Sequence, residues 1–158
     1  MSVGPDGWFP ATRRAIVDGD IVAHSCAWVG DKAPSFKASL AAAREMMFNF
    51  REALEIEEAT IYLTGPGNFR KELTDTYKAN RKDKPLPRYL NHVKKYLIKH
   101  WGAEETVGIE ADDMISIHAY ENPTKIVCST DKDLDQIQGW HYNWRKFSVY
   151  YVTPLSRS

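Results

Sequence analysis

The sequence contains little cysteine and no long hydrophobic run. Cys26 and Cys128 form no C-x-x-C pair, so we expect both to be small buried residues of a reduced protein. No apolar run approaches the roughly 18 residues that a membrane span needs, so we do not expect a transmembrane helix. The first 20 residues lack the apolar segment of a signal peptide, so we expect a cytoplasmic protein with no membrane partner.

The sequence also lacks a net charge, because 21 Lys and Arg residues balance 21 Asp and Glu residues. This balance argues weakly against nucleic-acid binding, since contacts to phosphate need basic side chains. The charges are unevenly distributed, however. Residues 70–99 contain ten Lys or Arg residues and three acids, whereas acids dominate residues 104–135. The pattern suits a site in which one segment holds phosphate and the other holds metal.

No internal repeat or low-complexity segment interrupts the chain, and 158 residues fit one ordinary domain. Residues 1–12 predict a flexible arm, and residues 13–158 predict a single folded unit. The hydrophobic pattern predicts strands at 14–18, 59–63, 105–107 and 125–129 and helices at 21–28, 34–58, 88–101, 110–120 and 131–137. A closing hairpin or two edge strands follow at 141–144 and 147–152, and residues 78–87 predict a mobile polar segment. This alternation is typical of an α/β fold with a parallel sheet and helices on both faces.

Acidic residues follow the predicted strands. Asp18 and Asp20 come after the first strand, and Asp131 and Asp133 come after the strand at 125–129. In open parallel sheets, ligands bind beyond the carboxyl ends of the strands. Each group taken alone has an ordinary explanation, as a strand-to-helix turn or as a helix cap. Their joint occurrence at the same edge of one sheet favours a functional site.

The strongest acidic motif is Glu110-Ala-Asp112-Asp113, in the first turn of a predicted helix. An acidic helix start is also a common solvated feature, favoured by the helix dipole. Three carboxylates so close together repel one another, and a hard divalent cation relieves that repulsion. Ligand sets made only of oxygen select Mg²⁺ or Mn²⁺. The motif therefore predicts a metal site.

The sequence offers no convincing Cys, Ser or His nucleophile. Its five His residues are scattered, and we expect each to be structural or to lie on the surface. Two metal ions about 4 Å apart activate water and stabilise the leaving oxygen of a phosphodiester without a protein nucleophile. The absence of such a nucleophile is therefore compatible with metal-dependent hydrolysis.

A basic segment lies between the acidic groups. It contains Asn68-Phe-Arg70-Lys-Glu-Leu and Tyr77-Lys78-Ala-Asn-Arg81-Lys82. If the second stretch is helical, Lys78 and Arg81 lie one turn apart and can face the same phosphate. Tyr77 can stack on an unpaired base. The ordinary alternative is a solvated basic loop.

Together these motifs resemble the 5′-nuclease family of flap endonucleases and 5′→3′ exonucleases, and its phage branch most closely. The resemblance runs from about residue 14 to 152 and includes Ile16-Val-Asp18-Gly19 and Ser129-Thr-Asp131-Lys-Asp133-Leu besides the stretches above. It implies a PIN-like three-layer fold, with a central, mainly parallel sheet flanked by helices. It also implies two Mg²⁺ or Mn²⁺ ions, held directly or through water by Asp18, Glu110, Asp112, Asp113, Asp131 and Asp133.

The resemblance further implies a DNA substrate with 5′ ends or flaps, as in primer removal or genome processing. Lys78 and Arg81 are the expected catalytic residues beside the scissile phosphate. The DNA-binding residues that the resemblance implies are Arg70, Tyr77, Lys78, Arg81 and Lys82. The expected location is the cytoplasm of a bacterium or of a phage-infected host.

Two departures from the family pattern matter. Many members have an Asp after the second strand, where this chain has Thr64 and Gly65. The helix–turn–helix DNA-binding module that normally follows has no counterpart before residue 158. We therefore expect a short gene product, a fragment or a split protein that a second chain completes.

Two alternatives remain open at this point. The chain could be a catalytically incomplete module that binds metal and single-stranded DNA without cleaving it. It could also be a PIN-type ribonuclease, since that fold uses clustered acids too. The basic segment at Tyr77 and the Asn68-Phe-Arg70 stretch favour the flap-type nuclease over the ribonuclease.

Overall fold

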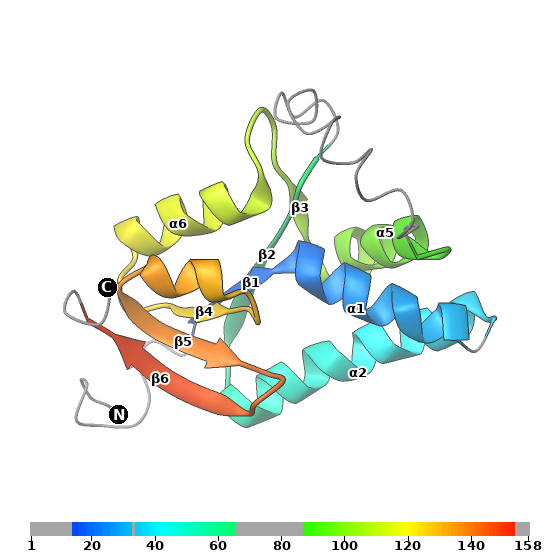
Figure 1. Cartoon of the computed structure of the whole chain (residues 1–158), viewed down its shortest axis with the longest axis horizontal. Coiled ribbons are helices and arrows are strands. Elements are labelled where there is room, and N and C mark those ends of the chain that lie inside the picture. The colour runs from blue at the N-terminus through cyan, green and yellow to red at the C-terminus, as the bar shows by residue number, and fades with distance from the viewer. Residues whose placement is uncertain (1–13, 33, 66–86, 154–158) are drawn as a thin grey trace.

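The computed structural model describes residues 14–32, 34–65 and 87–153 (Figure 1). The predicted arm at 1–12 lies outside these residues, as does most of the predicted polar segment. The elements are β1 (Arg14–Asp18), α1 (Gly19–Lys32), α2 (Phe36–Leu54), β2 (Glu58–Leu63), α5 (Leu90–Trp101), β3 (Glu104–Glu105), α6 (Ala111–Glu121), β4 (Ile126–Cys128), the 3₁₀ helix η1 (Lys132–Gln136), β5 (Gly139–Asn143) and β6 (Ser148–Val152).

These strands form one six-stranded sheet in the order β3-β2-β1-β4-β5-β6. The first five strands are parallel, and β6 pairs antiparallel to β5 as a hairpin. Val17 of β1 lies between Ile61 of β2 and Cys128 of β4 in the register. The predicted α/β fold with a central, mainly parallel sheet is therefore confirmed. The hairpin interpretation of the last two strands is also right.

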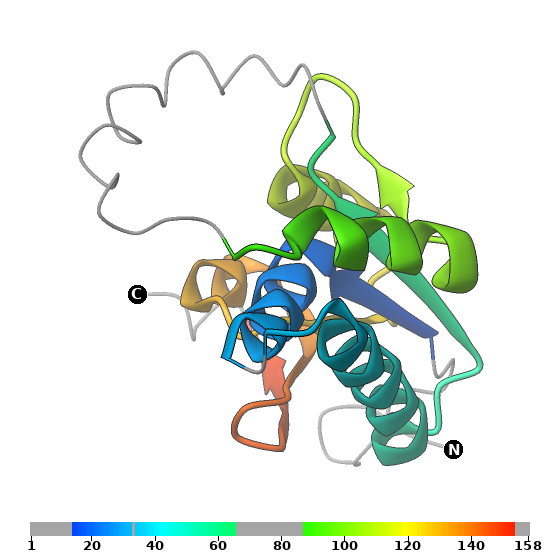
Figure 2. The same ribbon diagram turned by 90° about the vertical axis from the view of Figure 1, so that its right-hand side faces the viewer.

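Helices cover both faces of the sheet. The helices α1, α2 and α5 lie together in the foreground of Figure 2 and cover one face. The other face carries α6 and η1, which are visible on the opposite side of the strands in Figure 1. The sheet is therefore the middle layer of three. None of the helices in the described ranges is both long and apolar enough to cross a membrane.

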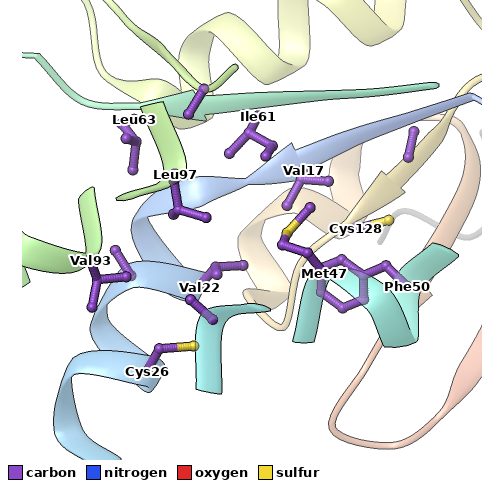
Figure 3. Close-up of a cluster of buried hydrophobic side chains, with 14 of the residues drawn as sticks. Val17, Val22, Cys26, Met47, Phe50, Ile61, Leu63, Val93, Leu97 and Cys128 are labelled. Carbon is purple, nitrogen blue, oxygen red and sulfur yellow. The ribbon is translucent and has the colours of Figure 1, made fainter. Parts of the chain in front are cut away.

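The larger hydrophobic core lies between the sheet and α1, α2 and α5. Apolar residues recur along α2 with helical spacing, so its Met47 and Phe50 are buried against the strands. Figure 3 shows these side chains meeting others from α1, α5 and the sheet: Val17, Val22, Cys26, Ile61, Leu63, Val93, Leu97 and Cys128. Both cysteines are free and buried, as predicted.

The other core is smaller and lies under α6. It contains Ile16 of β1, Val127 of β4 and Ile115 of α6, with Ala119 and Leu134. Successive side chains of a strand point to opposite faces. Ile16 therefore packs toward α6, while Val17 packs toward α1 and α2. This alternation decides which face of the sheet receives the acidic residues that follow.

Several element boundaries differ from those predicted. The helix predicted for 34–58 ends at Leu54, because Glu55 adopts the left-handed conformation (φ 53°) and its amide bonds back to the Arg51 carbonyl. The helix that residues 110–113 were predicted to open starts at Ala111, with Glu110 as its N-cap residue, and Gly108 in the preceding loop has a positive φ of 82°. The helix predicted for 131–137 is the shorter 3₁₀ helix η1 (Lys132–Gln136).

Candidate metal centre

Three neighbouring strands direct polar side chains to the same face at their carboxyl ends. Ile16, Tyr62 and Val127 pack in the small core under α6. Two residues further along each strand come Asp18, Thr64 and Ser129. Because side chains two residues apart share a face, these three continue on the α6 side. The fold thus gathers them where the strands end and α6 begins.

Asp18 is the last residue of β1, and the next residue, Gly19, starts α1 in close contact with β2. A Cβ at Gly19 would lie 2.5 Å from the Tyr62 carbonyl oxygen and 2.8 Å from the Ile61 side chain. The absence of a side chain therefore lets α1 begin directly against β2. Asp18 is 4% exposed, and its Oδ1 accepts a hydrogen bond of 3.4 Å from the backbone N–H of Ile21.

The second partner of Asp18 is Ser129, which follows β4. Its hydroxyl donates to Asp18 Oδ2 at 2.9 Å and accepts from the backbone N–H of Asp131 at 3.0 Å. Asp131 in turn caps η1, since its Oδ1 accepts from the backbone N–H of Asp133 at 2.9 Å. Ser129 thus connects the carboxylate of Asp18 to the loop that carries Asp131.

Burial raises the pKa of Asp18 to about 6. The hydrogen bond from Ser129 lowers it, the charge of Asp20 raises it, the bond from Ile21 lowers it, and Asp131 raises it. A buried carboxylate with nearby carboxylates is disfavoured in its charged form. A cation beside Asp18 would remove much of this penalty, so the site favours positive charge.

Asp20, in the first turn of α1, faces Thr64. Its Oδ1 accepts from the Thr64 backbone N–H at 3.0 Å, and its Oδ2 accepts from the Thr64 hydroxyl at 2.5 Å. The same hydroxyl oxygen accepts from the backbone N–H of Ala111 at 2.9 Å. Thr64 therefore joins the starts of α1 and α6 at the end of β2.

The loop before α6 is held against the end of β2. Thr106 donates its backbone N–H to the Leu63 carbonyl at 2.8 Å, and its hydroxyl donates to the Ile109 carbonyl at 2.5 Å. A Cβ at Gly65 would lie 2.1 Å from the Thr106 carbonyl oxygen. Close backbone contact at Gly65 thus positions the loop from which α6 starts.

The predicted acidic motif converges at the start of α6. Glu110, Asp112 and Asp113 each offer a carboxylate oxygen, and these oxygens lie within 4.8 Å of one another. All three side chains are partly buried. Glu110 occupies the N-cap position but makes no capping hydrogen bond, whereas Thr64 receives the Ala111 N–H. The three carboxylates therefore form a compact oxygen-only set, which fits a hard divalent cation.

The other predicted ligands lie at the same edge of the sheet and differ in their exposure to solvent. Asp18 is buried beneath the edge and Asp131 is partly buried, with its Oδ1 engaged in the cap. Asp133 is exposed on η1. Among the described residues, the compact cluster of potential metal ligands contains Glu110, Asp112 and Asp113. Five predicted site residues lie outside the described residues: Arg70, Tyr77, Lys78, Arg81 and Lys82.

Sequence reasoning missed how Ser129 and Thr64 hold the acids. Ser129 stood in a motif that matches the family and Thr64 at a departure from it, but the sequence does not show which distant residue a hydroxyl will bond. The sequence-based interpretation also grouped Asp20 with the other acids. It did not predict that the Asp20 carboxylate accepts hydrogen bonds from Thr64. The alternation of each strand could have identified the shared face, since Asp18, Thr64 and Ser129 each follow a residue packed under α6.

Residues 31–153 match the family described as the 5′-3′ exonuclease, N-terminal resolvase-like domain. The chain belongs to this family. The match includes the Glu110 motif, the Asp131 loop and Thr64 and leaves Asp18 just outside its start. A comparison with curated proteins finds no match.

The fold agrees with solved structures of a bacteriophage T5 nuclease. One is the T5 5′-exonuclease with bound zinc ions, with a TM-score of 0.62 and 19% identity over 87% of this chain. Another is the T5 flap endonuclease in a complex with DNA and metal ions, with a TM-score of 0.61, 15% identity and the same coverage. These likenesses confirm the PIN-like fold of this family member. The chain spans 57–58% of the length of the T5 chains in these two structures.

Proposed function

We propose that this family member is a divalent-metal-dependent 5′-nuclease that hydrolyses phosphodiester bonds at DNA 5′ ends or flaps. The observation that carries the proposal is the set of three carboxylates at the start of α6, whose oxygens lie within 4.8 Å of one another. Their position at the carboxyl edge of the sheet is where such folds bind ligands. Family membership supports nuclease chemistry at this edge.

The ligand set supports Mg²⁺ or Mn²⁺ as the cofactor. Glu110, Asp112 and Asp113 supply the compact group, and Asp18, Asp131 and Asp133 are proposed as further direct or water-mediated ligands of a two-ion centre. Carboxylate oxygens suit these hard cations. When bound, such ions activate water and neutralise the charge that develops on the phosphodiester.

The protein groups have separate roles in this proposal. Ser129 holds the Asp18 carboxylate, and the Gly65–Thr106 contact holds the loop before α6. Lys78 and Arg81 are proposed to hold the scissile phosphate, because guanidinium and ammonium groups stabilise its charge. Arg70, Tyr77 and Lys82 are proposed to contact the DNA strand.

Cleavage of a 5′-labelled flap DNA by the purified chain tests the proposal, with Mg²⁺, with Mn²⁺ and with EDTA. We expect metal-dependent release of the labelled 5′ end, lost in Asp112→Asn and retained in the matched control Glu45→Gln, an exposed acid on α2. Lys78→Ala and Arg81→Ala should reduce cleavage while leaving metal binding unchanged. Cleavage that persists in EDTA would contradict the proposal.

The second candidate function is a module that binds metal and single-stranded DNA without cleaving it. The observation that favours it is Thr64 at the end of β2, where many members of the family have an Asp, so this edge of the sheet offers one carboxylate fewer. Metal-dependent DNA binding without product, followed by cleavage when a second chain is supplied, would identify a partner-completed enzyme.

The same cleavage assay with single-stranded RNA tests the ribonuclease alternative, which predicts that RNA is the preferred substrate.

A further inference from the structure

Thr64 connects three segments of the chain that are far apart in sequence. Its backbone N–H and its hydroxyl donate to the two carboxylate oxygens of Asp20, 44 residues away. Its hydroxyl oxygen accepts the backbone N–H of Ala111, 47 residues away in the other direction. Thr64 itself directly follows β2. One side chain therefore joins the start of α1, the end of β2 and the start of α6.

Chemistry determines the direction of both hydroxyl bonds. A backbone N–H only donates, so the Thr64 oxygen is the acceptor for Ala111. An ionised carboxylate only accepts, so the Thr64 hydroxyl proton points to Asp20. A threonine hydroxyl has one proton to donate, and here that proton and one lone pair are both used. A residue with either function alone could not make both bonds.

The contact at Ala111 supplies a distant partner at a helix start that has no side-chain cap. The first amides of a helix have no partner within the helix, and the side chain at the N-cap position usually satisfies one of them. Glu110 holds that position without capping, and the distant Thr64 receives the first amide instead. Ala111 lies between Glu110 and Asp112, so this bond holds the acidic group of α6 at its centre.

The contact at Asp20 holds the opposite side of the site. Asp20 is two residues from Asp18, and Gly19 between them is packed against the Tyr62 carbonyl. This short connection cannot shift without moving the end of β1. A bond from Thr64 to Asp20 therefore relates the position of Asp18 to that of the Glu110 group.

We propose that Thr64 is a positioning residue whose hydroxyl sets the spacing between the carboxylate of Asp18 and the three carboxylates of α6. This inference rests on the proposed function, because the spacing matters for divalent cations bound between the two groups. Thr64 makes no contact with substrate in this role. It acts through Asp20 and the first amide of α6.

Two substitutions separate the hydroxyl from the rest of the side chain. Thr64→Val keeps the shape of the side chain and the backbone bond to Asp20 Oδ1, but it removes both hydroxyl bonds. Thr64→Ser restores the hydroxyl. Thr60→Val, four residues earlier on β2 and away from the carboxyl edge, is the matched control for loss of a threonine hydroxyl from this strand.

Calorimetric titration of the four proteins with Mn²⁺ gives a readout that does not depend on cleavage. We expect Thr64→Val to bind Mn²⁺ at least about 10-fold more weakly than the wild type, as for other residues that orient metal ligands. Thr64→Ser and Thr60→Val should bind as the wild type does. Equal affinities in the wild type and Thr64→Val would overturn the inference and leave the proposed function standing.

Two further results cover the remaining outcomes. If the wild type binds no Mn²⁺, the proposed function fails together with this inference. If Thr64→Val does not fold, amide hydrogen exchange in the metal-free wild type decides, because a first-turn amide exchanges rapidly unless it is hydrogen-bonded. Protection of the Ala111 amide supports the role of Thr64, and rapid exchange at Ala111 overturns it.

Discussion

The hydroxyl of Ser129 donates a hydrogen bond of 2.9 Å to Oδ2 of Asp18, between the ends of two adjacent parallel strands. Both side chains are buried, and burial raises the pKa of Asp18 to about 6. The Ser129 bond works against that rise. Asp18 is therefore a charged group that the fold tolerates through one neighbouring hydroxyl, a backbone amide and, in the proposed function, a metal ion.

Ser129→Ala removes that hydroxyl. We expect the free energy of unfolding at pH 8 to fall by about 1.5–3 kcal/mol, because a buried charged group loses a hydrogen bond. The loss should be smaller at pH 5, where Asp18 is largely protonated. Urea unfolding at both pH values measures the effect, and Ser148→Ala on β6 is the control. An equal loss at the two pH values would contradict the role given to Ser129.

The raised pKa of Asp18 also predicts a pH dependence of the metal-free protein. The ordinary pKa of 3.8 applies to the unfolded chain, so between about 4 and 6 the folded state binds more protons. The contribution of Asp18 to the free energy of unfolding therefore decreases as pH rises through this window, by on the order of 3 kcal/mol, and is constant above it.

Asp18→Asn isolates this contribution from that of the histidines. Burial lowers the pKa of His141 and His118, which makes stability rise with pH near their own titration. The useful quantity is therefore the difference in unfolding free energy between Asp18→Asn and the wild type. We expect it to grow in favour of the mutant from pH 4 to 6, when measured in EDTA. A difference independent of pH would show that Asp18 is not the titrating group.

Addition of metal should stabilise the wild type through the α6 carboxylates. At a free Mn²⁺ concentration 100 times the dissociation constant, binding to the native state adds about 2.7 kcal/mol to the free energy of unfolding. Asp112→Asn and Asp113→Asn should lose most of this gain, and Glu45→Gln should keep it. Unfolding curves with Mn²⁺ and with EDTA measure the gain. Equal stabilisation of all variants would place the bound ion elsewhere.

Gly65→Ala should disturb the loop that leads into α6. The added methyl group would lie 2.1 Å from the Thr106 carbonyl oxygen, so the backbone must move. We expect a loss of about 1–3 kcal/mol in the free energy of unfolding, together with weaker Mn²⁺ binding. Gly102→Asn is the control, since open space surrounds Gly102 and Asn tolerates its left-handed conformation. Unchanged stability of Gly65→Ala would contradict the close approach.

Leu97→Ala tests the larger core independently of the site. Leu97 is fully buried, and such truncations cost about 2–5 kcal/mol. Its neighbour Ile98 is 37% exposed, so Ile98→Ala should cost much less. Thermal or urea unfolding compares the two, with Mn²⁺ affinity expected to stay unchanged in both. Similar losses for the two variants would contradict the orientation of α5 (Figure 3).

Local pattern in the sequence was sufficient for much of the architecture. The apolar run at Arg14–Asp18 predicted β1 with its observed bounds, because a buried strand needs a continuous apolar stretch that ends where the chain meets polar groups. The spacing of Glu110, Asp112 and Asp113 predicted their convergence in one helical turn. These features depend on residues close together in sequence, whose geometry is set by the helix or strand itself.

Tertiary structure alone decided which distant groups hold the acids. The sheet order places β1 between β2 and β4, and only this arrangement brings Ser129 to Asp18 across 111 residues. It likewise brings Thr64 to both Asp20 and Ala111. The sequence by itself determined the chemistry of the proposed ligands, since a carboxylate offers the same oxygens wherever it lies. Their spacing and pKa depend on burial and on hydrogen bonds between segments, which arise only when the sheet and α6 pack together.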